Sequence, residues 1–470
     1  MRLLLLSLLF SVGISQLPAN TTITANQPEY ANQKLEFYYH DDPVTLKNIT
    51  AFSLNFNEQG NASVTIDINK TTCFYSDFGI YRGTVFIEPG ENINLKIPPL
   101  REKSFADQKN PYFEPVTFWF NSEQDENVNN QISAFIFQLN QYTDKHFDRL
   151  YFQQSKVVYD SLLYILDKNF SGITSQTFKT YRNLSLKLIQ ADVFRLKPEN
   201  YTSELSSISS SNWQYPLFED LLNKAFNNQL SSIAKSVNGS EVRKAVNGSD
   251  LKSLESWVKS YYKISGDMIR LTMLKLLYDG YYSGDFSKNT IEKMIQSSYF
   301  TNANNNLITK TAKNIYSKFI FLKVGFVAPE ICLDDLKGVE NCTGKNNHKY
   351  KYLLFADIEM IVCREHLKYL ASIEEKFQKY LEIYVIFRDV DVKEIDKFIA
   401  ENPVPGNLLI DKTGEYILGY NTKAFPQCFL LDENHNVKLE SAKSPLDGFE
   451  QQFAALLRNE LIEQQRNQSK

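Results

Sequence analysis

The spacing of apolar residues changes twice along the chain, and this limits how it can fold. From about residue 21 to 99, short β-branched and aromatic runs alternate with polar residues at a period near two. From about 125 to 319, apolar residues recur at helical spacing, and from about 325 to 462 strand-like and helix-like segments alternate. A period of two marks a strand with one buried face, and a period of 3.6 marks a helix. The chain is therefore predicted to be multidomain.

The domain boundaries follow these changes of period. A chain of 470 residues, at about 150 residues per domain, has room for several packed cores. We predict a β-rich domain at 16–105 that forms a small antiparallel sandwich, a mainly helical domain at 106–322 and an α/β domain at 323–470. In the β-rich domain, strands are expected to begin near Leu35, Phe52, Ala62 and Gly83.

The first fifteen residues have the features of a signal peptide. Residues 1–2 form a positive start, residues 3–10 an apolar run, and residues 13–15 a small-x-small cleavage pattern before Gln16. The apolar run is too short for a bilayer span, which needs about 20 residues. No later segment is long and apolar enough either, so the mature chain is expected to be exported, with no integral membrane segment.

The charge and the cysteine and histidine content argue against nucleic-acid binding and against a metal site. The chain has 51 Lys+Arg against 55 Asp+Glu, a net charge of −4, so no basic surface for phosphate backbones is expected, and nucleic acid is not a predicted partner. It has five cysteines and five histidines but no CxxC motif and no zinc-type spacing. We expect neither a metal site nor a cofactor.

Two cysteines lie on what reads as a hairpin. The segment from Glu330 to Cys342 is predicted to turn at 335–338, which brings Cys332 and Cys342 opposite each other across two short strands. Directly opposed residues lie within disulfide reach, and an exported chain permits the bond. We predict a structural Cys332–Cys342 disulfide; two separate buried thiols are the alternative.

Three segments of the last domain resemble a known family. They are Ala328-Pro329-Glu-Ile-Cys-Leu, the strand ending at Phe355, and Phe425-Pro426-Gln-Cys-Phe-Leu-Leu-Asp. Together, over about 140 residues, they resemble the thioredoxin-like fold of exported bacterial thiol–disulfide oxidoreductases of the TlpA/ResA type. The resemblance implies a periplasmic location. It also implies a cis Phe425–Pro426 bond whose loop pairs with substrate backbone.

The redox motif of that family is degenerate here. Its Trp-Cys-x-x-Cys falls on Glu359-Met360-Ile361-Val362-Cys363, so the attacking cysteine is replaced by Met360 and only the second cysteine remains. A thioether cannot form the thiolate that attacks a disulfide. A carboxylate at Glu359 would also raise the pKa of a neighbouring thiol. Dithiol exchange is therefore not expected, and Asp357 and Glu359 are interpreted as charges on the rim of the sheet.

Two functional hypotheses follow, and whether the protein is an enzyme stays open between them. In the first, the domain is a redox-inactive scaffold that binds an extended peptide or an exported protein partner. The implied groove consists of Phe425, Pro426, Gln427, Glu359 and Met360. In the second, it is a thiol–disulfide oxidoreductase that uses Cys363, alone or together with Cys428, which lies two residues beyond Pro426. Cys73 is interpreted as a small buried hydrophobe.

Overall fold

The computed structural model describes residues 19–110, 112–237, 239–344, 348–388 and 392–468. The predicted signal peptide, residues 1–15, lies outside these ranges. The chain forms two compact units, Met1–Tyr316 and Ser317–Lys470. The second begins near the predicted boundary at 323. The predicted separation of a β-rich from a helical domain falls inside the first unit and stays a prediction.

The first unit contains two sheets that share one apolar core. Their strand orders are β4-β1-β7-β9 and β3-β2-β5-β6-β8. The core contains Ile23 and Leu95 from one sheet and Phe37 and Phe74 from the other, as in a β-sandwich. The strands are β1 Ala19–Asn26, β2 Lys34–His40, β3 Asn48–Asn55, β4 Asn61–Ile68, β5 Thr72–Phe78, β6 Tyr81–Ile87, β7 Asn92–Lys96, β8 Val116–Trp119 and β9 Asn121–Ser122.

Two details of the sandwich differ from the sequence-based expectation. The pairs β1–β7 and β6–β8 are parallel, so the sheets are mixed and not purely antiparallel. Strands β8 and β9 lie beyond residue 105, so the β structure extends into the range predicted to be helical. Both are short strands that join sheet edges formed much earlier in the chain. Their pairing depends on those distant edges and not on local periodicity.

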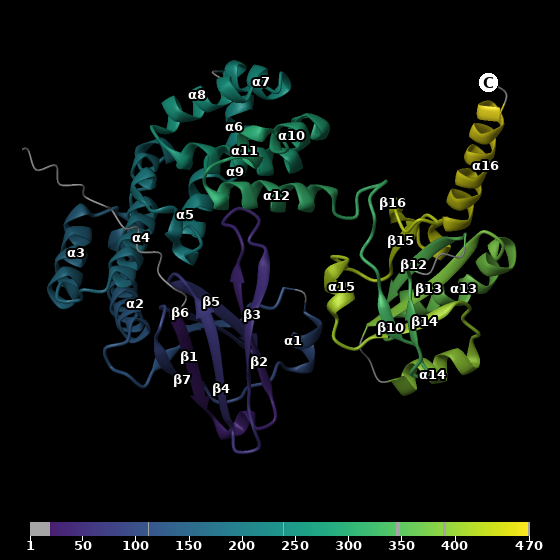
Figure 1. Cartoon of the computed structure of the whole chain (residues 1–470), viewed down its shortest axis with the longest axis horizontal. Helices are drawn as coiled ribbons and strands as arrows, with labels where there is room; N and C mark the ends of the chain where they lie inside the picture. Colours follow the sequence, from purple (N-terminus) through teal and green to yellow (C-terminus); the bar gives the residue numbers. More distant parts are fainter. Residues whose placement is uncertain (1–18, 111, 238, 345–347, 389–391, 469–470) are drawn as a thin grey trace, which may run out of the picture. The chain divides into compact units, whose positions relative to one another are not determined.

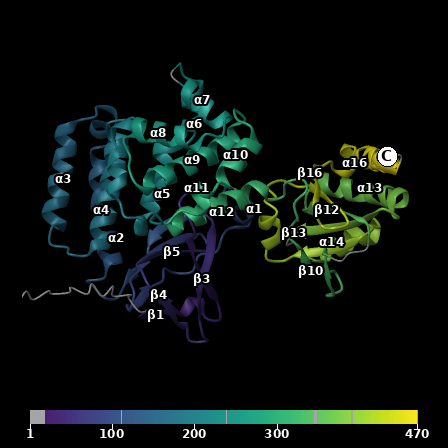
Figure 2. The ribbon, with the colours of Figure 1, turned by 45° about the horizontal axis from the view of Figure 1, so that its top comes forward.

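Helices form the rest of the first unit, and Figure 2 shows them beside the strands of the sandwich. Asn129 on α2 ties this layer to β6, because its side chain accepts from Phe86 N–H (2.7 Å) and donates to Phe86 C=O (2.8 Å). The helices are α1 Phe105–Lys109, α2 Val128–Lys145, α3 Lys156–Phe170, α4 Gln176–Val193, α5 Pro216–Phe226, α6 Gln229–Lys235, α7 Ser240–Asn247, α8 Leu251–Tyr262, α9 Asp267–Ser283, α10 Lys288–Ile295, α11 Ser298–Thr301 and α12 Asn306–Ile320.

The second unit contains a five-stranded sheet of order β14-β13-β12-β15-β16 (Figure 1). Strands β12, β13 and β14 are parallel to one another; β15 is antiparallel to β12, and β16 is antiparallel to β15. A separate hairpin, β10–β11, precedes the sheet. The elements are β10 Cys332–Asp334, β11 Glu340–Cys342, β12 Tyr350–Ala356, α13 Ile361–Phe377, β13 Leu381–Arg388, α14 Val392–Glu401, β14 Asn407–Asp411, α15 Glu415–Gly419, β15 Gln427–Leu431, β16 Val437–Ala442 and α16 Phe449–Gln468.

This order of elements is that of a thioredoxin-like fold. A βαβ unit, β12-α13-β13, supplies the parallel centre, and the β15–β16 pair with α16 completes the layers. The sheet is buried on both faces: Tyr352 and Leu354 belong to one apolar cluster, and Leu353 and Phe355 to the other. Across the described ranges of the whole chain, no helix has both the length and the apolar character of a membrane span.

Candidate functional site

The candidate site begins where β12 gives way to α13. Met360 is the N-cap of α13, in an extended conformation, and its side chain makes no capping hydrogen bond. Other hydrogen bonds, made by polar groups of the loop before the helix, hold this turn instead of a capping bond. The Asp357 carboxylate accepts from Glu359 N–H (3.0 Å), and Arg364 Nε donates to Ile358 C=O (2.6 Å). The start of the helix is thus held without the side-chain cap that most helices use.

The first residues of α13 present apolar side chains to solvent. Met360 is 40% exposed, Ile361 76% and Val362 45%. Glu359, the predicted groove residue before them, is exposed as well. Three consecutive exposed apolar residues are unusual on a soluble protein and are more typical of a binding surface. We call residues 360–362 the helix-start patch.

Cys363 lies directly behind this patch and is fully buried. Burial raises the pKa of its thiol to about 11; the Asp357 backbone N–H acts in the opposite direction, and the Asp357 charge raises the pKa further. A thiol with that pKa is ionised in roughly one molecule in ten thousand at pH 7. Because the thiolate is the nucleophile, Cys363 is held in its unreactive form.

Cys428, the second predicted thiol, lies on β15 beside Leu354 of β12. It is 3% exposed and belongs to the same apolar cluster as Cys363. Burial raises the pKa of its thiol to about 12, hydrogen bonds from Tyr352 and Ser444 lower it, and the nearby Cys363 raises it. The structure therefore brings the two cysteines into one part of the core, but both are free thiols.

The loop before β15 contains the predicted cis peptide. Phe425–Pro426 is cis, and Gln427 pairs with Phe355 near the end of β12. Phe425, Pro426 and Gln427 are all partly buried. Among the backbone hydrogen bonds that the described residues form outside their helices and strands, none involves Phe425. Its N–H and C=O thus have no backbone partner within this set of bonds.

An ion pair with one buried and one half-buried member supports this loop, and the sequence did not reveal it. Asp357 is 3% exposed, and its carboxylate lies 3.5 Å from the guanidinium of Arg388 at the end of β13. The same guanidinium lies over the ring of Phe425, 5.9 Å from its centroid. The interpretation of Asp357 as a rim charge was wrong; Glu359 alone is exposed. Because β12 and β13 are parallel, their carboxyl ends meet at one edge, which places Asp357 beside Arg388.

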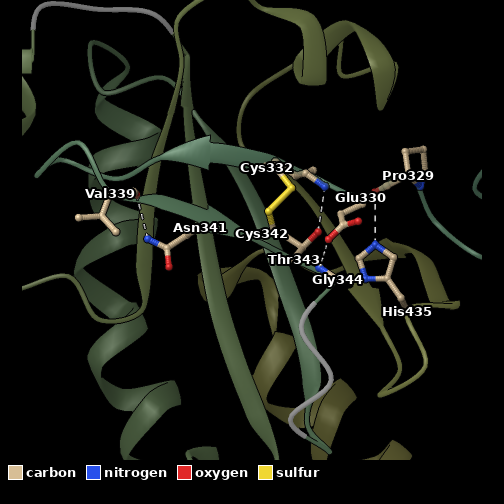
Figure 3. The surroundings of a disulfide bond; sticks show 10 residues. Pro329, Glu330, Cys332, Val339, Asn341, Cys342, Thr343, Gly344 and His435 are labelled. Carbon is tan, nitrogen blue, oxygen red and sulfur yellow. Dashed lines mark hydrogen bonds between the residues drawn. A yellow bond between two sulfur atoms is a disulfide. The ribbon is translucent and has the colours of Figure 1, made fainter.

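The remaining predicted pair, Cys332 and Cys342, forms a disulfide (Figure 3). The two residues are directly paired in the β10–β11 hairpin, with Cα atoms 4.1 Å apart. Cys73, in the first unit, is buried, and burial raises the pKa of its thiol well above the ordinary value.

Comparison with known proteins gives the same family as these motifs. No family model matches the chain. It is 26% identical to the thiol-disulfide oxidoreductase ResA of Geobacillus kaustophilus (strain HTA426) over 137 residues, 28% of this chain and 79% of that protein. The ResA of Geobacillus thermodenitrificans (strain NG80-2) matches with the same identity and coverage. The thioredoxin-like region is of the TlpA/ResA type.

Solved structures also match the TlpA/ResA-type region. A thiol:disulfide interchange protein from Bacteroides sp. is 24% identical, with a TM-score of 0.26 over 28% of this chain and 89% of that one. A putative thiol:disulfide interchange protein DsbE from Chlorobium tepidum is 24% identical, with a TM-score of 0.24 over 25% and 83% of the two chains. In this region Met360 occupies the position where the resemblance implies an attacking cysteine.

Proposed function

We propose that the TlpA/ResA-type region binds an extended peptide segment of an exported protein, without dithiol exchange. One observation carries the proposal: a cis-proline loop with unused backbone groups is present, whereas no exposed thiol accompanies it. Recognition of an extended chain by backbone pairing needs no nucleophile. Loss of the attacking cysteine therefore removes the redox step and leaves binding possible.

The helix-start patch would supply the side-chain contacts. An extended segment paired with Phe425 has side chains pointing alternately to its two faces. Those on one face would cover Ile361 and Val362, and burying an apolar side chain there is worth about 1.5–3 kcal/mol. The Asp357–Arg388 pair would hold the Phe425 ring in place while the segment binds. We expect a preference for peptides with alternating apolar residues.

The test uses fluorescein-labelled nine-residue peptides of alternating valine and threonine, with binding followed by fluorescence anisotropy on the full chain. Ile361→Asp should weaken binding at least ~10-fold, because it places a charge in the apolar contact. Leu461→Asp on α16 is the matched control, since Leu461 is also exposed, at 59%, and lies on another helix. Equal effects of the two variants, or no binding by the native chain, would overturn the proposal.

Export is part of the same proposal. A partner in an extracytoplasmic compartment requires that residues 1–15 direct the chain there and are removed. Expression with the native leader, followed by N-terminal sequencing of the exported product, should give a chain that starts at Gln16.

The alternative is a thiol–disulfide oxidoreductase that uses Cys363, alone or together with Cys428. The similarity to ResA proteins and the placement of both thiols in one apolar cluster favour it. Burial of both thiols and their raised pKa values oppose it. Measured reactivity of Cys363 distinguishes the two proposals.

A further inference from the structure

The β10–β11 hairpin gathers three potential metal-ligand atoms. The sulfur atoms of Cys332 and Cys342 and a carboxylate oxygen of Glu330 all lie within 4.8 Å of one another. No other such group of three occurs among the described parts of the chain. Figure 3 shows the Glu330 carboxylate beside the disulfide. The close approach of the sulfurs follows from their bond, so the position of Glu330 is the informative feature.

The backbone around the hairpin holds Glu330 in this position. Gly344 N–H donates to the Glu330 carboxylate over 3.2 Å. A Cβ atom at residue 344 would lie 2.1 Å from the same oxygen, so a side chain there would displace the carboxylate. Ile331 and Thr343 lock the adjoining strands, because Ile331 N–H donates to Thr343 Oγ1 and Thr343 N–H to Ile331 C=O. The carboxylate is thus oriented before any ligand arrives.

Two buried nitrogen groups nearby lack a well-aligned hydrogen bond. His435 lies on the far side of Glu330 from the disulfide in Figure 3 and is 9% exposed. Its Nε2 is 3.3 Å from Pro329 C=O, whereas its Nδ1 makes no well-aligned hydrogen bond among the described residues, with the Thr343 backbone as a further neighbour of the imidazole. Lys351 is fully buried, and its ammonium group likewise makes none among these residues. Buried polar groups without partners are rare and call for an explanation.

We propose that the reduced hairpin is a binding site for Zn²⁺, with Cys332, Cys342 and Glu330 as ligands. Thiolates, carboxylates and imidazoles are the donors that Zn²⁺ prefers. Two thiolates, one carboxylate and one Zn²⁺ sum to a charge of −1, which the buried Lys351 would balance. The fourth position would be open to water or to His435. In the oxidised state the sulfurs are bonded to each other and the site is closed.

The redox step requires a reductant, which we take to be a dithiol. Its two thiols become a disulfide, and their two electrons and two protons convert the Cys332–Cys342 bond into two thiols. On binding, each thiol loses its proton to solvent, so Zn²⁺ forms two metal–sulfur bonds and two protons are released. The site would bind metal only where a reducing dithiol is present. This proposal does not depend on peptide binding at Phe425.

Co²⁺, which takes tetrahedral thiolate sites and absorbs visible light, is the probe. The full chain is reduced with a phosphine, and one equivalent of Co²⁺ should produce thiolate-to-cobalt charge-transfer and tetrahedral d–d bands that Zn²⁺ removes. The oxidised chain is the internal control, because it carries the same three free thiols, Cys73, Cys363 and Cys428. No bands in the reduced chain, or equal bands in both states, would overturn the proposal.

Two variants assign the ligands without removing sulfur. Glu330→Gln keeps an acceptor for Gly344 N–H and should weaken Zn²⁺ binding at least ~10-fold, since even outer-shell changes cost that much. Glu340→Gln on β11 removes an equal charge from an exposed position of the same hairpin and should leave the affinity unchanged. Equal affinities of the two variants would exclude Glu330 as a ligand and contradict the proposed site.

Discussion

The second unit contains two pairs of neighbouring cysteines, of which one pair forms a disulfide and the other does not. Cys332 and Cys342 are partly buried, lie ten positions apart on one hairpin and are bonded. Cys363 and Cys428 are 65 residues apart in sequence, lie in one apolar cluster, and stay free. The first pair is brought together by local backbone register, whereas the second meets only through the folded sheet. The comparison shows that in this unit a disulfide forms where register pairs two cysteines directly, and not where two cysteines share the apolar core.

The strongest test of this comparison restores the missing thiol. Met360→Cys places a cysteine at the start of α13, three residues before Cys363, where the helix N-terminus lowers a thiol pKa. We expect a 360–363 disulfide, and insulin reduction with a dithiol reductant at least about 10-fold above the native chain.

The matched control is Val362→Cys, which exposes a thiol on the same helix turn but next to Cys363 in sequence. It should give no activity. If the Met360→Cys thiol fails to bond to Cys363, the assignment of the redox motif to residues 359–363 is wrong.

The next largest effect concerns the bonded pair. Replacing both Cys332 and Cys342 by alanine should lower the free energy of unfolding of the second unit by about 3 kcal/mol, the chain-entropy value for a loop of this length. All three tryptophans, at 119, 213 and 257, belong to the first unit. Tryptophan fluorescence should therefore report an unchanged transition.

The second unit needs its own probe, which the free pair provides. Cys363 can be alkylated in short pulses at increasing urea concentration and the product identified by mass mapping. The extent of alkylation then measures how far the apolar core of the second unit has become exposed. A transition that does not shift in the double variant would show that the disulfide adds nothing to stability.

A smaller effect is expected from pH. The folded pKa of Cys363 is about 11, against an ordinary value of 9.0. Between these values the unfolded chain has released a proton that the folded chain retains, so raising the pH favours unfolding. Stability should fall by at most about 1.4 kcal/mol per pH unit through this thiol. Cys363→Ala should reduce the slope of stability against pH between pH 9 and 11, measured by urea unfolding; an unchanged slope would contradict burial of the thiol.

Local patterns predicted much of the second unit. The strand ending at Phe355 and the hairpin disulfide follow from period, turn residues and register over a few residues. The cis Phe425–Pro426 bond came from the resemblance to a family and is confirmed. The edge strand β14 was not predicted, because its five residues are short and lack a distinctive pattern.

Features set by distant contacts were not predictable in this way. Asp357 resembles any polar residue at a strand end, and its burial depends on Arg388, 31 positions later. Lys351 lies inside the strand β12 and is fully buried. The residue types next to it in the sequence do not indicate that its ammonium group is buried. Likewise, β8 and β9 join sheets whose edges form earlier in the chain.

Native-state alkylation of Cys363 tests the central claim most directly, namely that this TlpA/ResA-type region keeps the binding loop but not the reactive thiol. The folded, non-reduced chain is treated with iodoacetamide at pH 7, and modification of each cysteine is followed by mass mapping. We predict that Cys363 reacts at least about 100-fold more slowly than a free thiol in the urea-unfolded chain, because only the exposed thiolate reacts. Reaction of Cys363 at or above the unfolded rate would contradict this account and favour the oxidoreductase.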